Sequence, residues 1–215
     1  MRRTAVHTAV HTAVPTAVLA VTALLLTACG GGEQADQSAP APSREASAPA
    51  ADDPVVAEPP AIEGLEVLVE DPSHEHVEGP LDYDRVPPLG GEHNSRWLAC
   101  DVYDEPVPHA FAVHSLEHGA VWLAYAPDLP ADQAALLADL AATDREYVLV
   151  SPEPGLDSRV VAVTWGAALE ASSADDPRLA EFVRAYAGGD QGGEPGAPCR
   201  GRGVTPREAR GMLGS

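Results

Sequence analysis

Residues 119–125 read GAVWLAY, and this apolar run predicts a buried strand at the centre of the fold. Residues 128–130 (DLP) follow it and lead into residues 131–142, whose alanines and leucines predict a helix. Two further strands are expected at 147–150 and 159–165, and Ser151-Pro152 is expected to end the first of them.

The segments on either side complete the pattern. Residues 64–70 (GLEVLVE) alternate apolar and acidic side chains, which predicts a half-buried strand. Residues 71–109 contain many prolines and glycines and are expected to form a long loop. Acids and a proline open a final helix over residues 175–186. The sequence therefore predicts an α+β fold: a single compact domain with a mixed β-sheet, two main helices and a long histidine-bearing loop.

The chain is strongly acidic. Its 215 residues include 33 aspartates and glutamates against 13 basic residues, all of them arginines, for a net charge of −20. Residues 61–188 alone hold 24 acids and six arginines. Such a surface repels phosphate backbones, so we expect no nucleic acid partner. It raises the local concentration of cations instead.

The amino terminus has the form of an export signal. Two arginines are followed by an apolar run at residues 16–28, which is short for a membrane span. The sequence Leu26-Thr27-Ala28-Cys29 resembles the bacterial lipobox. This resemblance implies that Cys29 becomes the lipidated first residue of a lipoprotein on the outer face of the cell membrane. An uncleaved anchor with an unpaired cysteine is the alternative.

Four segments follow from these patterns. We predict a signal peptide at 1–28, a lipidated and disordered Ala/Pro/Ser-rich tether at 29–60, a globular domain at 61–188, and a Gly/Pro-rich tail at 189–215. The last part of the tail, residues 201–215, is expected to be frayed.

Six of the eight histidines fall between positions 74 and 118. His74 and His76 share a side if their segment is extended, and His114 and His118 share a face if theirs is helical. Converging imidazoles suit copper, zinc or nickel. The predicted metal ligands are His74, His76, His93, His114 and His118, with Glu75 and Glu117 as further ligands or as acceptors that orient a ring. His109 is expected on the surface.

Other interpretations of these residues stay open. The histidines are also compatible with a metal-free polar network in a structural or partner-binding lipoprotein. Residues 114–118 also match H-x-x-E-H, in which the glutamate activates water on zinc, and Glu194 lies 76 positions beyond His118 as a third ligand. Glu194 lies in QGGEPGAP, which is not expected to be helical. We favour a metal-binding protein over an enzyme, with copper preferred and zinc next.

Most of the ordered region resembles a bacterial family catalogued as domain of unknown function 3105. The matching blocks are residues 83–93 (YDRVPPLGGEH), Val102-Tyr103, and residues 113–121 (VHSLEHGAV). The sequence departs from the family pattern at Leu89-Gly90, where Thr-Ser is usual, and at Asp101, where Gly is usual. The resemblance supports the choice of histidines and an exported or membrane-anchored protein. It implies no reaction.

Cys100 and Cys199 remain once Cys29 is assigned to the lipid. Two cysteines in an exported chain favour a disulfide, which would pin the tail beside the histidines. Closing a loop of this length stabilises the fold by roughly 4–5 kcal/mol in the chain-entropy model. The alternative is that Cys100 is a thiolate metal ligand.

Overall fold

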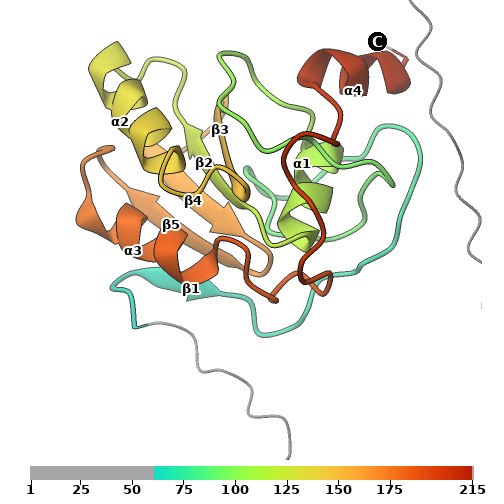
Figure 1. Ribbon diagram of the computed structural model, residues 1–215, viewed down its shortest axis with the longest axis horizontal. Coiled ribbons are helices and arrows are strands. Elements are labelled where there is room, and N and C mark those ends of the chain that lie inside the picture. Colours follow the sequence, from blue (N-terminus) through green and yellow to red (C-terminus); the bar gives the residue numbers. More distant parts are fainter. Residues whose placement is uncertain (1–60, 215) are drawn as a thin grey trace, which may run out of the picture. The chain divides into compact units, whose positions relative to one another are not determined.

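The computed structural model describes residues 61–214, which are organised around one mixed sheet (Figure 1). Its strands are β1 (Leu65–Val67), β2 (Val121–Tyr125), β3 (Val148–Pro152), β4 (Val160–Thr164) and β5 (Ala167–Ala171). Their spatial order is β1-β5-β4-β2-β3. Only β2 and β3 pair in parallel, and the other neighbours are antiparallel. The predicted α+β fold with a mixed sheet is confirmed.

Four helices accompany the sheet in the described residues: α1 (His109–Glu117), α2 (Ala131–Ala141), α3 (Pro177–Tyr186) and α4 (Pro206–Met212). The helix α2 connects β2 to β3, as a parallel pair requires a crossover. The start of α3 follows from its sequence, because the Asp176 side chain accepts a hydrogen bond from the Arg178 backbone N–H and Pro177 fits the first turn.

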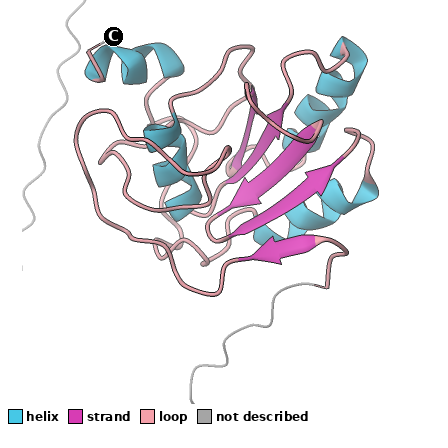
Figure 2. Ribbon diagram, turned by 180° about the vertical axis from the view of Figure 1, so that it is seen from behind, coloured by secondary structure: helices cyan, strands magenta, loops and turns pink. Residues whose placement is uncertain are grey.

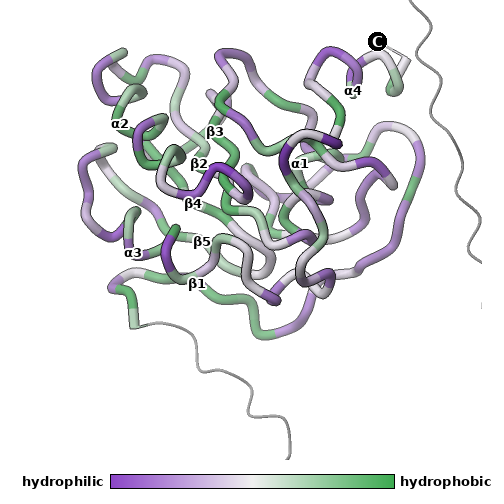
Figure 3. The backbone as a smooth tube through the Cα atoms, viewed as in Figure 1, coloured by the Kyte–Doolittle hydropathy of each residue, from purple (hydrophilic) through white to green (hydrophobic). Residues whose placement is uncertain are grey.

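The sheet has two different faces, each with its own core. The helices α2 and α3 lie on one side of the sheet and α1 on the other (Figures 1 and 2). Side chains alternate along β2, so Val121 and Leu123 enter the core under α2 and α3, whereas Trp122 packs with α1. The central strands are correspondingly hydrophobic (Figure 3). We call the side of α2 and α3 the helix face and the side of α1 the histidine face.

The strand predictions need three corrections. The expected strand at 64–70 is confined to Leu65–Val67. The strand β3 does not end before Ser151 but continues through Pro152. It lies at the edge of the sheet, where the missing N–H of a proline costs no hydrogen bond between strands. The strand β5 was not predicted. It follows β4 through a tight turn at Gly166, which has a φ of 71°, and its alanine-rich sequence carries no clear alternation.

Two helices were also missed. Residues 109–117 are helical, although the loop was expected to run to His109, and residues 110–117 are buried on every side, which removes the amphipathic signal. The end of the tail is not frayed at 206–212, where α4 begins with a capping box formed by Thr205 and Glu208. Buried Ala209 packs α4 into the core of the histidine face.

No helix within residues 61–214 is long and apolar enough to cross a bilayer. The predicted signal peptide, Cys29 and the tether lie outside the described residues. The described tail belongs to the same compact unit as the sheet.

Candidate metal centre

The helix α1 and its C-cap residue supply three polar side chains to the interior. His114, Glu117 and His118 lie within about one turn of each other at its carboxyl end, and all three are buried. Ser115 anchors the helix by donating a hydrogen bond to the Leu98 carbonyl over 2.6 Å. Burying polar groups costs free energy unless they are paired, so their partners decide what this helix does.

A short backbone pairing brings two more histidines to α1. His76 and His93 form an isolated parallel bridge, in which the Val77 N–H donates to the His93 carbonyl over 2.7 Å. The ring centroids of His76 and His93 are 4.8 Å apart. The His76 ring also stacks on His114, with centroids 4.8 Å apart and planes 9° from parallel.

The first group of converging ligand atoms, which we call the Glu117 site, consists of His76, His93, His114 and Glu117, with all four atoms within 4.8 Å of one another. The Oε2 atom of Glu117 lies 2.9 Å from Nε2 of His93 and 3.5 Å from Nε2 of His76. His76 is the exposed member, with 42% of its side chain accessible.

The second group, the Glu194 site, consists of His114, His118 and Glu194. The Nε2 atoms of His114 and His118 are 3.0 Å apart. The Oε2 atom of Glu194 lies 3.2 Å from Nε2 of His118, and 48% of the Glu194 side chain is exposed. His114 therefore belongs to both groups.

Backbone carbonyls fix the tautomer of the three buried rings. The Nδ1 atoms of His93, His114 and His118 lie 2.7, 2.7 and 2.9 Å from the carbonyl oxygens of Gly91, Asn94 and Pro198, respectively. A carbonyl oxygen only accepts, so each Nδ1 carries a proton. In a neutral ring this leaves Nε2 as a bare lone pair, which is the arrangement found when histidine binds a metal through Nε2.

Four of the distances between these atoms lie close to the edge lengths of a coordination polyhedron. Two ligands about 2.0–2.1 Å from one ion, at angles of about 90–109°, lie roughly 2.9–3.4 Å from each other. The four separations measured across the two groups run from 2.9 to 3.5 Å. A pair of bare nitrogens, or a bare nitrogen beside a carboxylate, is repulsive at that distance unless a proton or a cation lies between them.

The electrostatics of the cluster favour a neutral nitrogen and a charged oxygen. Burial lowers the pKa of His114 to about 4, and repulsion from His118 and His93 adds to this effect. For Glu117, burial raises the pKa, but hydrogen bonds and attraction from His74 and His93 outweigh it, so the net shift is downward. At neutral pH the centre therefore offers an imidazole lone pair and a carboxylate, both of which are metal ligands.

His74 and Glu75, which were predicted as a metal ligand and as a further ligand or ring-orienting acceptor, lie outside both groups. The Nδ1 atom of His74 lies 2.6 Å from Oε1 of Glu117, its Nε2 lies 3.1 Å from Asp71, and its ring stacks on Trp165 at 4.4 Å. Partial burial lowers the pKa of His74, but the hydrogen bonds to Glu117 and Asp71 raise it overall. His74 thus orients the Glu117 carboxylate through Oε1, the oxygen that does not face His93. The exposed side chain of Glu75 belongs to neither group.

His109 is less exposed than expected, with 26% of its side chain accessible. Its Nε2 lies 3.0 Å from Oε2 of Glu153, a buried carboxylate. His109 belongs to neither metal group, and its partner Glu153 lies outside both groups as well.

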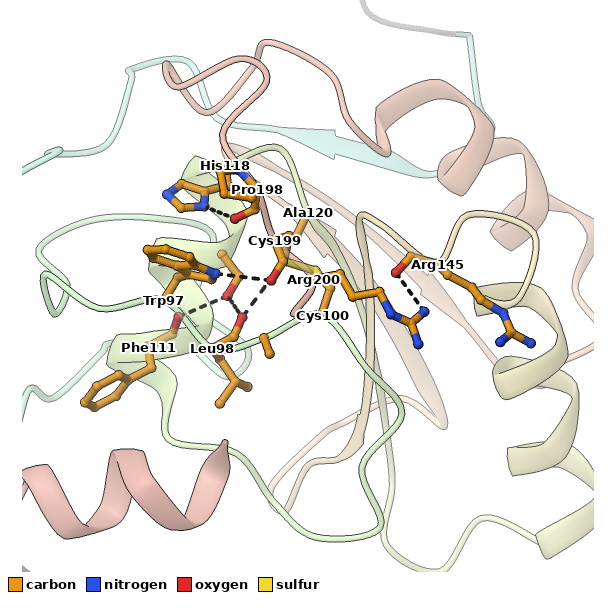
Figure 4. Close-up of a disulfide and its surroundings, with 12 residues drawn as sticks. Trp97, Leu98, Cys100, Phe111, His118, Ala120, Arg145, Pro198, Cys199 and Arg200 are labelled. Atoms are coloured by element: carbon orange, nitrogen blue, oxygen red, sulfur yellow. Dashed lines mark hydrogen bonds between the residues drawn. A yellow bond between two sulfur atoms is a disulfide. The ribbon is translucent and has the colours of Figure 1, made fainter. Parts of the chain in front are cut away.

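The cysteines form a disulfide and are not metal ligands. Cys100 and Cys199 are bonded, with Cα atoms 5.2 Å apart. Figure 4 shows the tail that this bond holds: the Trp97 indole N–H donates to the Cys199 carbonyl over 3.1 Å, and the adjacent Pro198 carbonyl accepts from His118. The disulfide therefore fixes the carbonyl that orients His118.

Residues 74–201 match the family described as "Protein of unknown function (DUF3105)", over more than half of the chain. The chain belongs to this family. The match begins at His74, two residues before the first ligand of the Glu117 site, and ends just beyond the disulfide, so the family region contains both candidate sites. No curated protein and no solved structure matches the chain.

The structure explains one departure from the DUF3105 pattern. Gly90, where serine is usual, has a φ of 137°, and a Cβ atom there would lie 2.9 Å from Pro72. Glycine thus lets the turn before His93 pack against the segment that carries His74. The Gly91 carbonyl in the same turn holds the His93 ring, so the departure leaves His93 in position.

Sequence reasoning missed part of the centre. The sequence pairs Glu194 with the histidines only as the third ligand of an H-x-x-E-H zinc motif, and the Gly/Pro-rich residues around Glu194 argue against that motif. Glu194 is indeed not helical. The predicted disulfide was the sequence signal that could have placed Glu194, because Cys199 lies five residues after Glu194 and its bond to Cys100 holds the tail near the histidines. The carbonyls that fix the tautomers have no sequence signature.

Proposed function

We propose that this protein is an extracytoplasmic, lipid-anchored protein that binds one transition-metal ion through its histidine cluster. The observation that carries this proposal is the set of three buried rings whose Nδ1 atoms face backbone carbonyls. Their other nitrogens face ligand groups: His93 and His114 converge with Glu117, and His118 converges with His114 and Glu194. The acidic surface of the domain adds a field that attracts cations.

Copper is the preferred ion and zinc the next. The Glu117 site offers three imidazole nitrogens and one carboxylate oxygen, and affinity for such neutral nitrogen donors peaks at Cu²⁺ in the usual order of divalent metals. Zinc accepts the same donors in tetrahedral geometry.

A hydrolase that uses Glu117 as its base receives less support. The two carboxylate oxygens of Glu117 each lie within 3 Å of an imidazole nitrogen: Oε1 is near His74 and Oε2 is near His93. A general base needs an oxygen free to face the attacking water. The arrangement is that of a ligand, held by its neighbours.

Metal analysis tests the proposal. The chain from Gly30 onward contains all six clustered histidines and omits His7 and His11. After equilibration with Cu²⁺ or Zn²⁺ at neutral pH and removal of free metal, we expect about one ion per chain. The His114→Ala/His118→Ala variant should retain none, and His109→Gln should retain the full amount. No stoichiometric metal in the unmutated chain would overturn the proposal.

The anchor has its own test. Cells that express the full-length chain are grown with labelled palmitate, and the label should enter the unmutated protein and be absent from Cys29→Ser. Equal labelling of the two proteins would contradict lipidation at this residue.

A further inference from the structure

The tail crosses the carboxyl end of α1 in direct backbone contact. A Cβ atom at Gly192 would lie 2.2 Å from the Glu117 carbonyl oxygen, so only glycine permits this approach. Two residues later the Glu194 N–H donates to the same carbonyl over 3.4 Å. The tail then continues to Pro198, whose carbonyl holds the His118 ring. Glu194 is thereby delivered to His118 by backbone packing.

The two metal groups compete for one atom. His114 contributes Nε2 to both, and its Nδ1 proton is committed to the Asn94 carbonyl over 2.7 Å. A neutral imidazole of this tautomer has one lone pair, so it cannot bridge two ions. The Glu117 site and the Glu194 site can therefore be filled only in turn.

The two sites also differ in coordination. The Glu117 site presents four donors, of which only His76 is exposed. The Glu194 site presents three donors, and one of them is a half-exposed carboxylate. A three-donor site leaves a coordination position open to an incoming ligand, whereas a site with four protein ligands is typically closed.

We propose that the Glu194 site is the exchange position for the ion that the Glu117 site stores. This inference rests on the proposed function. The ion keeps its bond to Nε2 of His114 throughout. Its bonds to His76, His93 and Glu117 break as bonds to His118 and Glu194 form, and an acceptor then takes the open position and removes the ion. No proton or electron is needed for this transfer.

The experiment measures binding and release separately. The chain from Gly30 onward is loaded with Cu²⁺, its stoichiometry and Kd are determined, and transfer of the ion to excess EDTA is followed by stopped-flow absorbance. We expect Glu194→Gln to bind one ion with a Kd within threefold of the unmutated chain and to release it at least tenfold more slowly. Glu181→Gln, an exposed carboxylate on the helix face, is the matched control and should change neither quantity.

Two further variants separate the roles of the sites. Glu117→Gln should weaken the Kd at least tenfold, because it removes a ligand from the storage site. Gly192→Ala removes no donor side chain but displaces the tail that carries Glu194, so it should slow release as Glu194→Gln does.

Several results would overturn the inference. Release from Glu194→Gln at the unmutated rate, loss of binding in Glu194→Gln, or simultaneous binding of two ions by the unmutated chain would each contradict an exchange position that shares His114. A chain that binds no Cu²⁺ at all would instead refute the proposed function itself, and the exchange position with it.

Discussion

The two faces of the sheet are built by different means. On the helix face, α2 and α3 cover the strands with aliphatic and aromatic side chains, and Leu179 and Phe182 are completely buried there. On the histidine face, a short buried helix, irregular segments and a disulfide enclose polar groups such as His93 and Glu117. Apolar burial stabilises both faces, but only the second also holds imidazole nitrogens and a carboxylate at separations that are repulsive unless a proton or a cation lies between them. The groups that could hold a metal ion are therefore confined to one face of the sheet.

The largest expected effect lies on the helix face. Phe182→Ala removes a fully buried ring and should lower the free energy of unfolding by about 3–5 kcal/mol, measured by urea denaturation. The Kd for Cu²⁺ of the folded variant should not change. A tenfold weaker Kd would show that the two faces are not independent.

The disulfide between Cys100 and Cys199 tests the histidine face in the same way. The Cys100→Ser/Cys199→Ser variant should lose roughly 2–5 kcal/mol of stability, because its unfolded state is no longer closed over a separation of 99 residues. Unlike Phe182→Ala, it should also slow release of Cu²⁺ to EDTA, since the tail that carries Glu194 and the Pro198 carbonyl is freed. A stability loss with an unchanged release rate would contradict this link.

The pH dependence of stability should come from the histidine face. The pKa of His114 is about 4 when folded, below its ordinary value of about 6.5, so the unfolded chain binds more protons between these values. The metal-free protein should therefore be most stable above pH 6.5 and lose up to about 3 kcal/mol as the pH falls towards 4.

Urea denaturation at pH 7.5, 6 and 5 measures this slope. The raised pKa of His74 acts in the opposite sense, because its contribution is complete below pH 6.5 and is lost as the pH rises through the folded value. His114→Gln should flatten the curve between pH 6.5 and 5. An equally steep curve in that variant would assign the effect to another group.

The smallest expected effect belongs to His109. His109→Ala should lower the free energy of unfolding by about 1–2 kcal/mol, because the buried carboxylate of Glu153 loses a hydrogen-bond donor. Thermal or urea denaturation measures this loss, and metal stoichiometry should be unaffected. A fall in bound metal would show that the cluster extends to His109.

The same contrast explains what the sequence could predict. Helices α2 and α3 and the apolar strand β2 follow from local sequence patterns, and their predicted ends lie within two residues of the observed ones. The helix α1 was missed because burial on all sides leaves no period, and its H-x-x-x-H spacing served only as a conditional hint. The clustering of histidines was visible, but the approach of Glu194 and of the Gly91, Asn94 and Pro198 carbonyls depends on contacts between distant segments. Such contacts leave no local trace.

The most direct test of the central claim is the protonation of the imidazole nitrogens, measured by ¹⁵N NMR with and without one equivalent of Zn²⁺. In the metal-free protein at neutral pH, we expect the Nδ1–H tautomer for His114 and protonated Nδ1 atoms for His93 and His118. One equivalent of Zn²⁺ should shift the Nε2 resonances of His76, His93 and His114. An Nε2–H tautomer at His114, or Nε2 resonances that Zn²⁺ leaves unchanged, would contradict a metal centre on this face.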